Sequence, residues 1–132
     1  MELHRLSFCK AIKLADDMAE FVVDEGVEFN LDRVDEYHFW ITGHLRSPYF
    51  LLIHKLHAYT YDFASQRKLG TLPGIQAAAF VVYSNVSELA TEVMLSMPRE
   101  SEWIYRIFDN RDDAVAWLEY QRESASPSIK AM

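Results

Sequence analysis

Two short, continuously apolar runs constrain the fold of this chain more than any other feature. Residues 49–53 read Tyr-Phe-Leu-Leu-Ile, and residues 77–83 read Ala-Ala-Ala-Phe-Val-Val-Tyr. A strand that is covered on both faces has this pattern, because neither of its sides reaches solvent. Such strands are typical of a parallel sheet flanked by helices. The two runs therefore predict an α/β domain.

Helical segments are predicted before and between these runs. Asn30 is a good N-cap for a helix that extends to about residue 45. Apolar and aromatic side chains recur in it at spacings of three and four, as an amphipathic helix requires: Leu31, Val34, His38, Ile41 and Leu45. A second helix is predicted for about residues 61–69, closed by Gly70.

The same alternation continues to the end of the chain. Asn85, with Glu88 three positions on, predicts the start of a helix. Its apolar residues form one stripe: Val86, Leu89, Ala90, Val93, Met94 and Met97. Residues 104–108 predict a last short strand, and Asn110 caps a final helix. Three residues of that helix are expected to face inward: Ala114, Trp117 and Leu118.

The first thirty residues predict an antiparallel hairpin. Residues 3–14 and 18–23 are compatible with strands, the Asp16-Asp17 pair between them is a turn signal, and residues 27–29 extend the pattern. The whole order predicts a mixed sheet of about five strands with about four helices. We expect one domain over residues 1–122 and a disordered tail over residues 123–132, which lack periodicity.

Charge and composition argue against several classes of partner. Thirteen Lys and Arg against 20 Asp and Glu give a net charge of −7, which repels phosphate backbones, so no nucleic-acid partner is expected. No run approaches the ~18–20 apolar residues of a membrane-spanning helix, so no membrane insertion is expected. The first residues lack a signal-peptide segment, and we expect a cytoplasmic protein. The lone Cys9 excludes an intramolecular disulfide and favours a buried structural thiol.

Several blocks of the chain follow a familiar pattern. Residues 107–118 read Ile-Phe-Asp-Asn-Arg-Asp-Asp-Ala-Val-Ala-Trp-Leu, which places a Phe-led acidic loop before an Ala-x-x-Trp-Leu helix. Residues 50–53, 59–62 and 77–82 read Phe-Leu-Leu-Ile, Tyr-Thr-Tyr-Asp and Ala-Ala-Ala-Phe-Val-Val, and Gly26 precedes a helix. Over residues 3–121 the chain thereby resembles the SpoIIAA-like, STAS-related family of bacterial proteins.

This resemblance implies a STAS-like mixed sheet and a regulatory role without an assigned reaction. In the phosphorylated members, a serine in an Asp-Ser-Ser-Gly-like motif opens the helix after the central strand. Here the corresponding residues 57–62 read His-Ala-Tyr-Thr-Tyr-Asp, with Thr60 as the nearest hydroxyl. Because the surrounding motif is missing, partner switching by phosphorylation is not expected.

Candidate site residues are those that follow the predicted strands. Ligands of open α/β sheets bind outside the carboxyl ends of parallel strands. The loops expected there supply the candidate ligand- or partner-binding side chains: His54, Lys55, His57, Tyr59, Thr60, Tyr61, Ser84, Asn85 and Asp109. Polar residues at this edge also cap helices, so a purely structural role stays open beside the functional one.

None of these residues makes a recognisable catalytic motif. His54 and His57 would need a third ligand to hold a metal, so no metal is predicted and surface histidines are the simpler explanation. Tyr59, Thr60 and Tyr61 are expected at a helix start, where backbone N–H groups can hold an anion or Thr60 can simply cap the helix. Without a Gly-rich phosphate loop or a Gly-x-Ser-x-Gly elbow, no cofactor and no catalytic residue are predicted.

Three functional hypotheses remain. The sequence favours a non-enzymatic regulatory or protein-interaction module, which acts on a protein partner or by self-association as a homodimer. Its surface would be residues 55–62 and the adjoining helix. A carrier of a small apolar or anionic ligand is the alternative, supported by a 14% content of aromatic residues. An enzyme is the third hypothesis and rests only on the histidine and threonine residues of the 54–60 segment.

Overall fold

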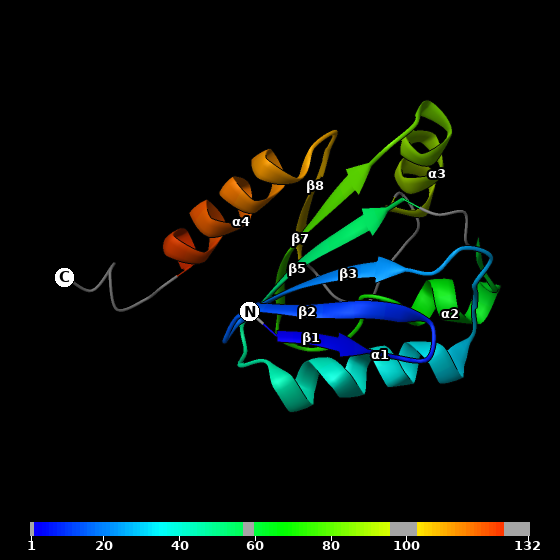
Figure 1. Cartoon of the computed structure of the whole chain (residues 1–132), viewed down its shortest axis with the longest axis horizontal. Coiled ribbons are helices and arrows are strands. Elements are labelled where there is room, and N and C mark those ends of the chain that lie inside the picture. Colours follow the sequence, from blue (N-terminus) through cyan, green and yellow to red (C-terminus); the bar gives the residue numbers. More distant parts are fainter. Residues whose placement is uncertain (1, 57–59, 96–102, 126–132) are drawn as a thin grey trace.

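The strand order places four parallel strands side by side in chain order. The structure is a computed structural model and describes residues 2–56, 60–95 and 103–125. These residues form a six-stranded mixed sheet in the order β1-β2-β3-β5-β7-β8, a two-stranded sheet of β4 and β6, and four helices (Figure 1). The predicted α/β class is therefore confirmed, with six strands in the main sheet where about five were expected.

The additional strand comes from the N-terminal segment. We expected one strand over residues 3–14, but the structure has β1 (Glu2–Arg5) and β2 (Cys9–Ala15), separated at residues 6–8. The Leu6 N–H donates to the carbonyl of Cys9 (2.9 Å) and closes a turn there. Strand β3 (Met18–Val23) then pairs antiparallel with β2 across the predicted acidic turn.

The two apolar runs form the central parallel strands. They are β5 (Tyr49–Lys55) and β7 (Ile75–Val82), and β8 (Ile104–Phe108) completes the sheet. Strands β5 and β7 are buried almost throughout, which confirms the prediction from their composition. Each is parallel to its neighbours in the order β3, β5, β7, β8.

A small second sheet corrects the expected position of Thr60 and Tyr61. Strand β6 (Thr60–Tyr61) pairs with β4 (Glu28–Phe29), so these residues do not start a helix. Long-range backbone hydrogen bonds hold this segment: the Thr60 N–H donates to the Val27 carbonyl at 2.9 Å and the Asp62 N–H donates to the Phe29 carbonyl at 3.0 Å. Helix α2 (Phe63–Lys68) begins only after Asp62, whose carboxylate accepts from a backbone N–H in its first turn.

Capping residues set the starts of the other helices. Helix α1 (Leu31–His44) begins as predicted after Asn30, whose side chain accepts from the Arg33 N–H at 2.9 Å. Helix α4 (Arg111–Ala125) begins after Asn110, and extends into the segment expected as a tail. Residues 126–132 of that tail lie outside the described residues. Helix α3 (Asn85–Leu95) is capped by the Ser84 hydroxyl and not by Asn85.

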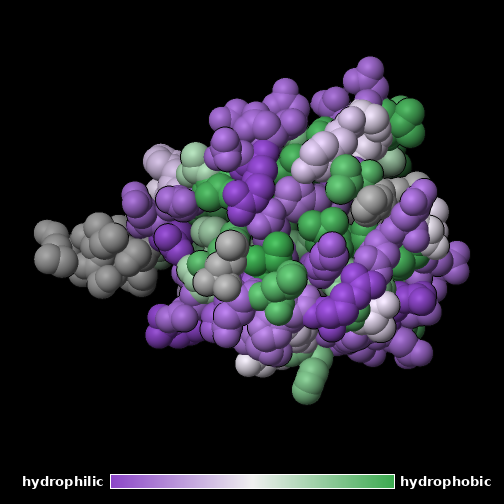
Figure 2. Space-filling view, in the orientation of Figure 1, coloured by the Kyte–Doolittle hydropathy of each residue, from purple (hydrophilic) through white to green (hydrophobic). Residues whose placement is uncertain are grey.

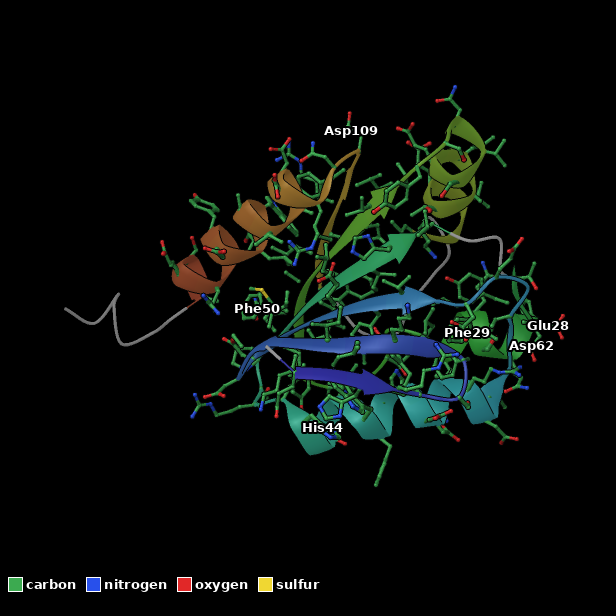
Figure 3. The ribbon with its side chains drawn as sticks, viewed as in Figure 1. Glu28, Phe29, His44, Phe50, Asp62 and Asp109 are labelled. Atoms are coloured by element: carbon green, nitrogen blue, oxygen red, sulfur yellow. The ribbon has the colours of Figure 1, made fainter. Side chains whose placement is uncertain are left out.

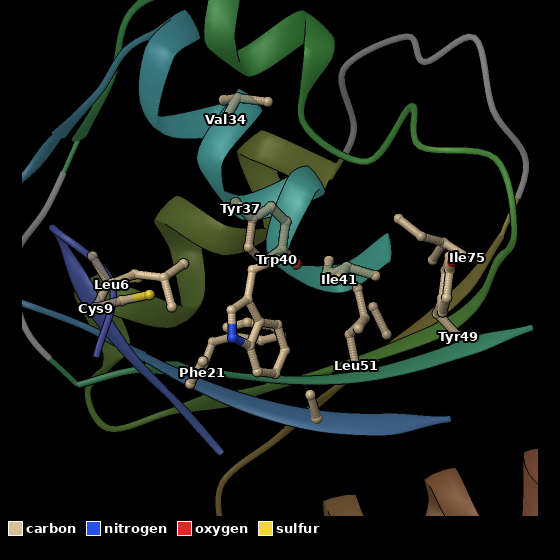
Figure 4. Packing of buried hydrophobic residues seen from close by; sticks show 14 of the residues in the cluster. Leu6, Cys9, Phe21, Val34, Tyr37, Trp40, Ile41, Tyr49, Leu51 and Ile75 are labelled. Atoms are coloured by element: carbon tan, nitrogen blue, oxygen red, sulfur yellow. The ribbon is translucent and has the colours of Figure 1, made fainter. Parts of the chain in front are cut away.

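Three helices lie on one face of the sheet, and one lies on the other. Parallel crossovers are right-handed, and the strand order advances in one direction, so α1, α2 and α3 are placed on the same face. Figure 1 shows α1 and α2 below the sheet and α4 on its opposite side. The core on the first face buries Tyr37 and Trp40 of α1 against Phe21 and Leu51 (Figure 4).

This packing revises the expected inner face of α1. Its buried residues are Val34, Tyr37, Trp40 and Ile41, whereas Leu31 is 42% exposed. Of the predicted stripe, Val34, Ile41 and Leu45 are buried and His38 is half-buried, whereas Tyr37 and Trp40 are additional inward residues. The smaller core on the opposite face is closed by Ala114 and Leu118 of α4, as predicted.

Candidate functional site

The carboxyl end of β5 directs two adjacent candidate residues to opposite faces of the sheet. Successive side chains of a strand alternate between its faces. His54 lies on the α4 face, whereas Lys55 lies on the face covered by α1, α2 and α3. The candidate residues at this edge therefore form two separate groups instead of one site.

The Lys55 amine is enclosed by aromatic side chains. Its Nζ donates a hydrogen bond to the Tyr61 hydroxyl and lies 5.0 Å from the centre of the Tyr61 ring and 5.7 Å from that of Phe80. The residue is only 8% exposed. Because burial penalises the ammonium form, the pKa of Lys55 falls to about 7. A lysine in this state holds a substantial fraction of its amine neutral near pH 7.

An apolar cavity lies close to this lysine, although Lys55 is not part of its wall. Its volume is about 60 Å³, and its wall includes Tyr61 and Phe80, whose rings lie beside the amine. Other wall residues come from β3, β5 and the segment before β8: Phe21, Leu51, Ile53 and Trp103. Cys9 also faces the cavity and is fully buried, which raises the pKa of its thiol to about 12 and keeps it protonated.

On the opposite face, Glu20 lies at the centre of a polar cluster. Its carboxylate accepts a bidentate pair of hydrogen bonds from Arg111, at 2.7 Å from Nε and 2.9 Å from an Nη atom. It also accepts from His54 Nε2, whose ring Nδ1 lies 2.6 Å from the Tyr83 hydroxyl. Burial acts to raise the pKa of Glu20, but the hydrogen bonds from His54 and Arg111 outweigh it and lower that pKa to about 2.

This cluster joins elements that are distant in sequence. Glu20 is on β3, His54 is on β5, Tyr83 follows β7, and Arg111 is the first residue of α4. Burial and the nearby Glu20 carboxylate raise the pKa of Tyr83, so its phenol stays protonated. The cluster fixes the start of α4 against the sheet by charge-assisted hydrogen bonds.

The remaining predicted residues are dispersed. Ser84 and Asn85 lie at the start of α3, and Thr60 is exposed on β6. Figure 3 shows Asp109 where β8 turns into α4, far from Asp62 beside α2. His57 and Tyr59 lie outside the described residues, and among those that are described no three His, Cys, Asp or Glu side chains gather in a metal-binding arrangement.

Helix α3 presents an unusual surface. Three residues of its predicted apolar stripe are exposed: Val86 (79%), Leu89 (63%) and Val93 (52%). Met97 of that stripe lies outside the described residues. Over the same residues, the side facing the sheet carries Ser87 and the buried Thr91, and a buried apolar residue, Leu95, follows only at the end of the helix. Part of the exposed apolar surface is visible at the upper right of Figure 2. Over residues 86–93 the helix therefore has its amphipathic pattern reversed relative to an ordinary surface helix.

Sequence reasoning missed the central residue of the polar cluster. Glu20 stands alone as a charge within the apolar strand sequence Met-Ala-Glu-Phe-Val-Val. A carboxylate in such a run signals a buried, paired charge, because an isolated buried charge is too costly. Its partner Arg111 was only part of a predicted loop, and the pairing joins residues 91 positions apart.

Comparison with known protein families, with curated proteins and with solved structures finds no match to this chain. Within the described residues, no helix is long and apolar enough to cross a membrane. The contacts and surfaces above are therefore the basis for any functional assignment.

Proposed function

We propose that this protein is a non-enzymatic interaction module that docks through the outward face of α3. The single observation that carries this proposal is the reversed amphipathicity of the helix. Contiguous exposed apolar surface on a protein marks an interaction site more often than scattered single residues do. A regulatory role and a STAS-like sheet, which the resemblance to SpoIIAA-like proteins implies, belong to the same proposal.

The occupant that fits this face best is a second copy of the chain. Val86, Leu89, Ala90 and Val93 recur at the three- and four-residue spacing of a helix-pairing seam. The small Ala90 at its middle lets a second helix approach closely. A two-fold axis would place the same stripe on both sides of the contact, which makes it self-complementary.

One exposed apolar residue lies next to the start of α3. Leu56, which is 50% exposed, follows Lys55, whose carbonyl accepts a hydrogen bond from Ser87 of α3. Its burial would add to that of the helix toward the roughly 800 Å² per partner of a specific interface.

Sedimentation velocity over a range of protein concentrations tests this proposal. We expect the full chain to form a concentration-dependent dimer, and Leu89→Glu to be monomeric because it buries a charge at the seam. Phe39→Glu is the matched control, since Phe39 is 74% exposed on α1 and should leave the dimer intact. A monomeric full chain at high micromolar concentration, or a dimeric Leu89→Glu variant, would overturn the proposal. Circular dichroism confirms that the variants are folded.

The cavity favours a second candidate function, that of a carrier for a small apolar ligand. Its wall is almost wholly apolar and it lies within the core beneath α1 and α2. Small-ligand sites share this apolar lining with a few polar groups that fix orientation, and a volume of about 60 Å³ limits the ligand to a few heavy atoms. A rise in melting temperature with short-chain apolar compounds would support a carrier. Unchanged melting temperatures with the whole series would contradict it.

A further inference from the structure

Lys55 combines three features that neither the pairing surface nor a simple apolar carrier requires. The amine is buried, it contacts a phenol hydroxyl, and the rings of Tyr61 and Phe80 beside it also form part of the wall of the apolar cavity. A lysine that serves only to keep the surface polar would extend its ammonium group into water. Here the strand directs the side chain inward, among Tyr61 and Phe80.

We propose that Lys55 is a covalent attachment site for a small apolar aldehyde, whose chain occupies the adjacent cavity while its carbonyl carbon forms an imine with Nζ. This inference rests on the second candidate function, the carrier, and names the chemical class of its ligand. It is independent of pairing through α3.

The chemistry of the site fits each stage of imine formation. The lone pair of Nζ attacks the carbonyl carbon, a C–N bond forms, and a proton moves from nitrogen to oxygen to give a carbinolamine. The C–O bond then breaks as the hydroxyl leaves with a proton as water, and a C=N bond remains. The Tyr61 hydroxyl, which already contacts Nζ, is placed to supply and recover that proton. No oxidant or reductant is consumed.

Burial makes this amine more nucleophilic at neutral pH than an exposed lysine amine. Only the neutral amine is a nucleophile, and a pKa of about 7 leaves about half of Lys55 neutral at pH 7. An ordinary lysine, with a pKa near 10.4, is neutral in roughly one molecule in 2,500 at that pH. The cavity adds to this by holding an apolar aldehyde near the amine.

Reductive trapping tests the proposal on the full chain. The protein is incubated at pH 7 with butanal and cyanoborohydride, and modified lysines are identified by peptide mass mapping. We expect Lys55 to be butylated at least about tenfold faster than exposed lysines such as Lys68, given its larger neutral fraction. Glycolaldehyde, a small hydrophilic aldehyde, should show a clearly smaller preference for Lys55, because it gains from the larger neutral fraction of the amine but not from the apolar cavity.

Matched variants separate attachment from binding. Lys55→Arg should lose the rapid modification, whereas Lys68→Arg should retain it. Modification that is spread evenly over the lysines, or that is unchanged in Lys55→Arg, would overturn the proposal. If Lys55→Arg does not fold, mapping of the unsubstituted protein still shows whether Lys55 is modified faster than the other lysines. If butan-1-ol and butanal both raise the melting temperature while Lys55 is not trapped, the carrier stands and the imine is refuted. If neither compound binds and nothing is trapped, both fail.

Discussion

Replacing Lys55 by methionine should stabilise the protein at pH 7, and by an amount that depends on pH. Methionine keeps the apolar stem and removes the ammonium group. The pKa of Lys55 falls from 10.5 to about 7 on folding. The unfolded chain therefore binds a proton that the folded chain holds only weakly, and stability decreases as the pH falls from about 10.5 to about 7.

The size of the effect follows from this shift. At about 1.4 kcal/mol per pH unit, the buried amine costs roughly 4 kcal/mol of folding free energy at pH 7. Losing the hydrogen bond to Tyr61 offsets about 1 kcal/mol of the gain. We therefore expect Lys55→Met to be more stable by about 3 kcal/mol at pH 7, and this advantage should disappear near pH 10.

Urea unfolding followed by tryptophan fluorescence, at each pH between 7 and 10, measures this difference. Groups common to both proteins cancel in the comparison, and repeating it in a Tyr61→Phe background removes the neighbouring phenol. A difference in unfolding free energy that stays constant over this pH range would refute the reasoning. It would mean that the amine remains charged in the fold, and it would also weaken the case for imine formation.

Three further predictions test the framework of the fold. The pKa of Glu20 is lowered to about 2, so the stability that the ionised carboxylate contributes is present above pH ~4.5 and is lost as the pH falls toward 2. In urea unfolding, Glu20→Gln should therefore lower the free energy of unfolding by about 3 kcal/mol at pH 6 and by less at pH 3. Asn30→Ala should cost about 1 kcal/mol, measured in the same way, through loss of the α1 cap. Gly70→Ala should lower the melting temperature, because φ is +85° and the new Cβ would meet Trp103 at 2.8 Å; Gly43→Ala, which meets nothing, should raise it slightly.

The sequence predicted elements whose causes are local. Continuous apolar composition identified β5 and β7, and a side-chain cap identified the start of α1 at Asn30. Strand β6 could not be found in this way, because its two residues depend on pairing with β4, some thirty residues earlier in the chain. The residues around positions 60 and 61 do not by themselves indicate that pairing.

Which side of a helix faces the sheet was harder to predict than where the helix lies in the sequence. Periodicity shows that α3 has an apolar side, but it does not say which way that side points. The hydrogen bond from Ser87 to the Lys55 carbonyl and the burial of Thr91 settle this, and both depend on tertiary contacts. In α1 the larger rings of Tyr37 and Trp40 took the inner positions for a similar reason, since the space above Phe21 accommodates aromatic side chains.

The same limit applies to the candidate site. Residues at the carboxyl ends of β5 and β7 were identified from the sequence, but His54 and Lys55 belong to β5 itself and not to a loop after it. His54 is also buried, whereas a surface histidine was expected. The separation of His54 and Lys55 onto two faces follows from strand alternation. The partners that define each group, Glu20 for His54 and Tyr61 for Lys55, come from other elements and appear only in three dimensions.

The placement of α4 alone on its face has a consequence for how the chain folds during synthesis. The six strands of the main sheet and the three helices of the opposite face all precede α4 in the chain, so they leave the ribosome before it does. Until then the side chains of Phe50, Leu52 and Ala79 lack the cover of Ala114 and Leu118. The nascent domain therefore carries an apolar sheet surface until its last helix emerges, and the ion pair between Arg111 and Glu20 forms in that final step.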